Sequence, residues 1–165
     1  MPTHEPQAPP VPAAAMPAFT LADILSILPH RPPFLFVDRV KSLLPGKRIE
    51  TERELRPDEW YFEGHFPGTP VMPGVLMVDG LAQTAGLLHG LTLRLAGDAA
   101  AEPAFLVLAS ANVKFLDLAR PGDLLTMTAT PGVTFGGIHR FSVHAMAGRR
   151  QLVRGELTLA ERQVE

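Results

Sequence analysis

A long apolar stretch at residues 71–93 constrains the fold of this chain more than any other feature. Its length and hydropathy raise the question of a membrane span. Several residues argue against one, because they break or polarise the stretch: Pro73, Asp79, Gln83, His89 and a number of glycines. We therefore predict a buried central helix that begins at Pro73, where proline suits the first turn, and ends near Leu95.

A helix that is apolar on every side has to be surrounded by other apolar surface. The rest of the sequence predicts a short helix after Thr20, and strands at 34–40, 47–56, 104–115, 123–134, 138–147 and 151–159. An irregular stretch, 57–74, precedes the long helix. One antiparallel sheet curling around the helix would bury it, so the expected fold class is α+β. A second subunit is expected to cover the rest of the helix.

The composition indicates one globular domain and excludes several functions. Residues 1–17 are rich in Pro and Ala and predict a flexible tail, which leaves 18–165 as the domain. A formal net charge of −2 gives no general attraction to nucleic acid. The absence of cysteine excludes disulfides, a thiolate nucleophile and a zinc–thiolate site. With no recognisable secretory signal, we expect a cytoplasmic protein that binds neither nucleic acid nor membranes.

Asp79 is the only side chain with a full formal charge between Gly64 and Leu93. A carboxylate is costly to bury without a partner, so it should be paired, neutralised or functional. Gln83 follows one helical turn later, where its amide can hydrogen-bond the carboxyl group. Two interpretations stay open from this residue alone: a catalytic carboxyl group, or an ion pair with a Lys or Arg from another strand.

His65 lies fourteen residues upstream, in a stretch from Gly64 to Gly74 that contains three prolines and several glycines. Such a stiff loop can place an imidazole accurately. Histidine is the natural general base near neutral pH, although a lone loop histidine is more often a surface residue. The backbone N–H of Gly74, at the helix start, has no partner inside the helix and can bind an oxygen that gains negative charge.

A base, an acid and an N–H donor together suit removal of a proton next to a thioester carbonyl, with loss of a β-hydroxyl group. His65 would take the proton, Gly74 would bind the thioester oxygen, and a protonated Asp79 would donate to the departing hydroxyl. Spacing alone makes this chemistry possible and does not establish it.

Longer motifs make the interpretation specific. The chain resembles the (3R)-hydroxyacyl-acyl carrier protein dehydratases of type II fatty acid synthesis, of the FabZ type, from about Leu21 to Leu159. The matching motifs are LPHRPPFLFVDRV at 28–40, GHFPG at 64–68, MPGVL at 72–76, Ala82-Gln83, Lys114-Phe115 and Pro121-Gly122-Asp123.

The resemblance implies a hot-dog fold, no cofactor and no metal, and an active site at the interface of a homodimer, with a trimer of dimers as the expected assembly. It implies His65 as the base and Asp79 of the partner subunit as the acid. Gly74, Val71 and Gln83 are the expected substrate-binding group, with the Val71 backbone orienting His65. The expected partner is acyl carrier protein that bears a phosphopantetheine-linked 3-hydroxyacyl chain.

The sequence departs from that family at some positions. Asp79 stands where the family usually has Glu; Asp is typical of the related dehydratase/isomerase enzymes, of the FabA type. Family members often have basic residues at positions 116 and 117, so docking of the carrier would depend on other cations, such as Arg39, Lys47 or Arg120. A dehydratase/isomerase, a non-catalytic acyl-binding protein and a thioesterase therefore remain alternatives.

Two further histidines, His30 and His89, are expected to be structural. His30, beside Arg31, belongs to a motif, and His89 is expected to be a satisfied core residue of the long helix. His139 and His144 lie five residues apart on one predicted strand. They should therefore point to opposite faces, which argues against a metal site shared by these two.

Overall fold

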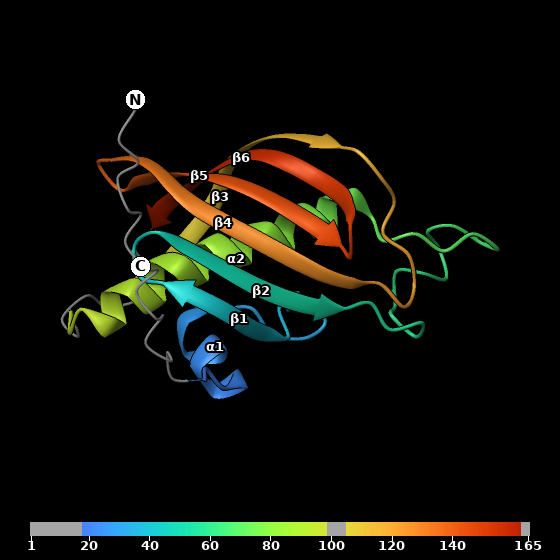
Figure 1. Cartoon of the computed structure of the whole chain (residues 1–165), viewed down its shortest axis with the longest axis horizontal. Helices are drawn as coiled ribbons and strands as arrows, with labels where there is room; N and C mark the ends of the chain where they lie inside the picture. The colour runs from blue at the N-terminus through green and yellow to red at the C-terminus, as the bar shows by residue number, and fades with distance from the viewer. Residues whose placement is uncertain (1–17, 99–104, 163–165) are drawn as a thin grey trace, which may run out of the picture.

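The computed structural model describes residues 18–98 and 105–162. A six-stranded antiparallel sheet, in the order β1-β2-β4-β5-β6-β3, curves over the long helix α2 (Gly74–Leu95) (Figure 1). The predicted α+β architecture is confirmed. The predicted tail at 1–17 lies outside the described residues.

The elements follow the predicted order of one helix, two strands, the long helix and four strands. Their bounds are α1 (Leu21–Ile27), β1 (Arg39–Leu44), β2 (Arg48–Glu54), α2 (Gly74–Leu95), β3 (Phe105–Phe115), β4 (Leu124–Phe135), β5 (Ile138–Ala147) and β6 (Arg150–Arg162). The predicted N-cap of α1 is confirmed. The Thr20 hydroxyl accepts a hydrogen bond from the backbone N–H of Asp23, and the Asp23 carboxylate accepts one from Thr20 N–H.

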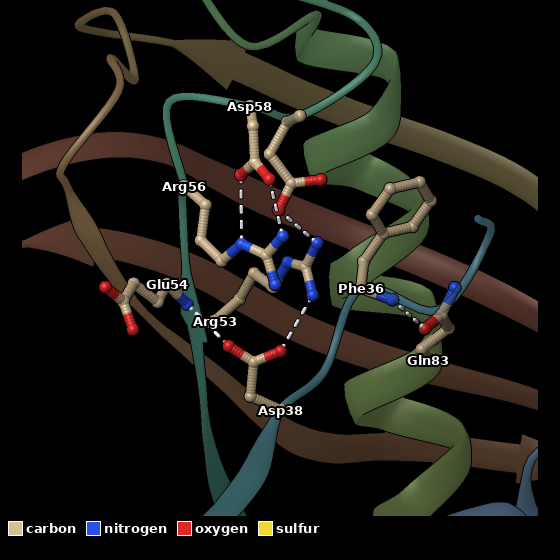
Figure 2. Close-up of polar contacts among 8 residues, drawn as sticks. Phe36, Asp38, Arg53, Glu54, Arg56, Asp58 and Gln83 are labelled. Carbon is tan, nitrogen blue, oxygen red and sulfur yellow. Dashed lines mark hydrogen bonds and ion pairs between the residues drawn. The ribbon is translucent and has the colours of Figure 1, made fainter. Parts of the chain in front are cut away.

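The strand predicted at 34–40 is wrong over residues 34–38, because β1 begins only at Arg39. In this segment the Gln83 side chain takes the place of a neighbouring strand. Its amide nitrogen donates to the Phe34 carbonyl oxygen at 2.9 Å. Its amide oxygen accepts from Phe36 N–H, also at 2.9 Å (Figure 2). Both backbone groups are thus satisfied away from the sheet.

Asp38 marks the point where this segment joins the sheet. Its carboxylate accepts hydrogen bonds from Glu54 N–H and from the Arg53 guanidinium, each at 2.7 Å (Figure 2). Arg53 also pairs with Glu59, in the turns that lead toward residue 65. The network therefore ties the segment before β1 to β2 and to the start of the irregular stretch.

The core lies between α2 and the concave face of the sheet. Leu81, Leu87 and Leu88 of α2 are at most 1% exposed, and the residues of β5 alternate between buried and exposed positions. Val75, in the first turn of α2, is 73% exposed. The helix is therefore enclosed along its middle and open at its N-terminal end. Among the described residues, no helix is long and apolar enough to cross a membrane.

Candidate active site

The loop before α2 holds His65 in a defined orientation. The Nδ1 atom of His65 lies 2.8 Å from the carbonyl oxygen of Val71, and Val71 N–H donates to the His65 carbonyl oxygen, also at 2.8 Å. The predicted contact between the Val71 backbone and the imidazole is thus present. When Nδ1 carries the proton and donates it to Val71, Nε2 keeps its lone pair. That tautomer is the form that a general base requires.

The same loop is fastened to the rest of the domain at both sides of the histidine. Phe66 and Thr69 exchange two backbone hydrogen bonds, and Met72 N–H donates to the carbonyl oxygen of Ala119 at 2.8 Å. The Phe66 ring stacks on the imidazole, with ring centroids 4.0 Å apart. The His65 side chain is therefore half-buried and held from two directions.

Asp79 lies in the second turn of α2 and is half-buried. Its Oδ2 atom accepts a hydrogen bond from the Gln83 amide at 2.7 Å, which is the predicted i,i+4 contact. Gln83 is itself only 1% exposed and anchored to the backbone of Phe34 and Phe36. Within residues 18–98 and 105–162, no Lys or Arg forms an ion pair with Asp79. The structural ion pair considered from sequence is therefore not formed there.

His30 lies closer to this carboxyl group than the sequence suggested. Burial lowers the pKa of His30, and the negative charge of the nearby Asp79 opposes that shift. Its Nδ1 atom is buried without a hydrogen-bond partner among the described residues. The LPHR motif was the only feature of the sequence that drew attention to His30. Its distance along the sequence from position 79 gave no indication that the two residues lie close together.

Gly74 is the first residue of α2, one residue after the predicted start at Pro73, and its N–H has no acceptor among the described residues. The Phe115 ring lies directly against it. A Cβ atom at position 74 would come within 2.7 Å of Phe115 Cε1. Glycine thus allows the end of β3 to approach the N-terminus of the helix, and the half-exposed ring forms one wall beside the free N–H.

We expect Gly74→Ala to lower the free energy of unfolding by about 1 kcal/mol, at the low end for overpacking because the half-exposed Phe115 ring can shift. Urea unfolding measures the change. Gly64→Ala is the matched control, since its added Cβ would meet nothing within 4 Å. The double variant Gly74→Ala/Phe115→Leu should regain part of the free energy of unfolding that Gly74→Ala loses. Equal stability of the two single variants would contradict the contact.

No hydrogen bond or ion pair joins His65 to Asp79 within the described part of the chain. The structure brings His65 together with Val71, and Asp79 together with Gln83. Gly74, the first residue of α2, lies between these two pairs in the sequence. A hollow on the convex face of the sheet, lined by Lys114, Ser142, His144 and Arg154 among others, contains none of these residues.

A curved antiparallel sheet wrapped around one long helix defines a hot-dog fold. The chain belongs to the FabA-like family, whose family model matches residues 28–153. It is 40% identical over 146 residues to 3-hydroxyacyl-[acyl-carrier-protein] dehydratase FabZ of Polynucleobacter necessarius, covering 88% of this chain and 94% of that protein. It is 39% identical to the FabZ of Chlamydia caviae, covering 87% and 92%. The predicted family is thus confirmed.

Solved structures support the fold. The dehydratase heterocomplex ApeI:P of Xenorhabdus doucetiae superposes with a TM-score of 0.71 at 16% identity, covering 85% of this chain and 91% of that one. A hypothetical thioesterase of Streptococcus pneumoniae, solved with coenzyme A, gives 0.56 at 11% identity, covering 75% and 84%. Because the fold hosts both classes, it does not by itself select between dehydration and thioester hydrolysis.

Proposed function

We propose that this protein removes water from (3R)-3-hydroxyacyl chains carried on acyl carrier protein and releases the trans-2-enoyl product. One observation carries the proposal. In a chain about 40% identical to FabZ dehydratases, the loop contact between Val71 and His65 Nδ1 leaves Nε2 available as a base.

The reaction follows from the roles of three groups. His65 Nε2 takes the proton from C2 of the acyl chain, and the electron pair moves into the C2–C3 bond as the C3–O bond breaks. The free N–H of Gly74 stabilises the negative charge that develops on the thioester oxygen. Asp79 gives its proton to the departing hydroxyl, which leaves as water. The histidine can then return its proton to the carboxylate.

Gln83 sets the direction of the acid. Its amide donates to Oδ2 of Asp79, so Oδ1 is left to carry the proton toward the substrate. The amide cannot swing away easily, because the same nitrogen also donates to the Phe34 carbonyl oxygen and the amide oxygen accepts from Phe36 N–H. Gln83 is therefore a positioning residue in this proposal, and His65 and Asp79 are the catalytic residues.

The complete site is proposed to form between two copies of the chain. β3 is a long strand at the sheet edge. Its outer backbone side pairs with no strand among the described residues, which favours pairing with a strand of another chain. Apolar side chains near the site are exposed in the single chain: Phe66, Val75, Phe115, Leu116 and Leu118. Pairing of two β3 strands about a two-fold axis would cover them and bring Asp79 of one copy toward His65 of the other. A trimer of such dimers remains a prediction.

Docking of the carrier protein is proposed to involve Arg120. This exposed residue follows Ala119, whose carbonyl oxygen anchors Met72 of the site loop, and it forms no ion pair among the described residues. Arg39, the other arginine considered from sequence, is paired with Glu52 at 2.6 Å.

We place the reaction in the cytoplasm, which agrees with a chain that has no cysteine.

Turnover of 3-hydroxyacyl-carrier substrates of several chain lengths tests the proposed function. Mass spectrometry should detect conversion to a trans-2-enoyl-carrier product by loss of one water. A cis-3-enoyl product would add the isomerase activity suggested by Asp79. Release of free carrier thiol would instead indicate a thioesterase, and binding without turnover would indicate a non-catalytic acyl-binding protein.

A further inference from the structure

Three metal-binding side chains from distant parts of the sequence meet at the other end of α2. They are His89 of α2, His139 of β5 and Glu161 of β6, and their ligand atoms all lie within 4.8 Å of one another. His139 Nε2 is 2.7 Å from Glu161 Oε1, and His89 Nε2 is 4.0 Å from the same oxygen. The two imidazole centroids are 4.5 Å apart.

The charges of this cluster favour a cation. Glu161 forms no ion pair with a Lys or Arg in the part of the chain that the structure describes, so its charge faces only the two histidines. When two imidazoles bind a metal through their neutral nitrogens, the carboxylate is the only charged ligand of the three, and its negative charge suits a divalent cation.

A fourth residue supports the orientation of His139. The Thr134 hydroxyl lies 3.3 Å from His139 Nδ1, so Nε2 is the nitrogen that faces His89 and Glu161. A hydroxyl can donate or accept, so the neutral imidazole can move its proton to Nδ1 when Nε2 binds a metal. Outer contacts of this kind fix the ligand nitrogen in known metal sites.

We infer that His89, His139 and Glu161 form a binding site for a divalent transition metal of the zinc type, with a water completing a tetrahedral shell. Zinc prefers two imidazoles and a carboxylate at about 2.0–2.2 Å, which separates the ligand atoms by roughly 3.3 Å. The observed separations of 2.7 and 4.0 Å lie on either side of that value. Small rotations of the partly exposed Glu161 side chain would equalise them.

The site is separate from the proposed catalytic centre. His89 follows Asp79 by ten residues on α2, or about 15 Å along the helix axis. A metal there would join α2 to β5 and β6. The expected consequence is a stabilised C-terminal half of α2.

Titration of the metal-free protein with Zn²⁺, and with Co²⁺ as a spectroscopic probe, tests the inference. We expect one ion per chain, a Co²⁺ absorption spectrum of tetrahedral type, and a Tm about 5–10 °C higher at a free metal concentration 100-fold above Kd. Glu161→Gln keeps a hydrogen-bond acceptor for His139 and should weaken binding at least tenfold. Thr134→Val, which removes the outer contact, should weaken it by about 10–100-fold.

Two controls separate this site from other histidines. His144→Gln alters the same strand on the opposite face and should leave metal affinity unchanged. His65→Ala removes the imidazole of the proposed active site and should also leave it unchanged. Circular dichroism of each variant checks that the fold is kept. Absence of binding by the wild type, equal binding by Glu161→Gln, or loss of binding only in His65→Ala would overturn the inference.

Discussion

Replacing His65 with Ala should reduce kcat for dehydration of a 3-hydroxyacyl-carrier substrate by about 10²–10⁴-fold. The substitution removes the base while the backbone hydrogen bonds on both sides of the loop remain, including Val71 N–H to the residue 65 carbonyl. Binding of the substrate should change little, because the imidazole acts mainly in the transition state. Steady-state turnover with carrier substrate, together with the Tm of the variant, measures both quantities.

Phe66→Leu is the matched control for this experiment. It removes the ring that stacks on His65, and it leaves the imidazole and its contact with Val71 in place. We expect a much smaller loss of kcat than in His65→Ala. If His65→Ala turned over substrate at the wild-type rate, His65 would not be the base and the proposed mechanism would be wrong.

Asp79→Asn should cause a loss of similar size, about 10²–10⁴-fold in kcat, because the amide cannot supply a proton to the departing hydroxyl. Its side-chain oxygen can still accept the hydrogen bond from Gln83, so the fold should be preserved. Asp79→Glu keeps the acid and lengthens it by one methylene group. This variant should keep more activity than Asp79→Asn, with an altered preference for acyl chain length.

Mixed dimers of the two variants test whether the site is shared between subunits. In a dimer with one His65→Ala chain and one Asp79→Asn chain, a shared arrangement leaves one intact site and one site with both defects. Heterodimers purified through two different tags should then show about half of the wild-type activity. If each site lay within one chain, both sites would be defective, and the mixture would be as inactive as either variant alone.

The sequence was sufficient to predict the architecture, which the structure confirms, whereas the catalytic roles of His65 and Asp79 remain predictions that the variants above test. An apolar helix has to be covered, and alternating strands can cover it, so burial alone predicted the curved sheet around α2. Local chemistry likewise predicted the N-cap at Thr20 and the contact between Asp79 and Gln83, since both join residues within one helical turn. The GHFPG and MPGVL motifs then indicated the family, which the comparisons confirmed.

Only the tertiary structure decided which distant groups meet. The strand predicted from Phe34 starts late because Gln83, 47 residues beyond Phe36, supplies the hydrogen bonds that a strand would have supplied. From sequence, His89 was assigned a structural role and His139 was only judged not to share a metal with His144. Their meeting with Glu161 depends on how β5 and β6 pack against α2. Periodicity describes one element at a time, so it shows the face on which a residue lies and not what that face contacts.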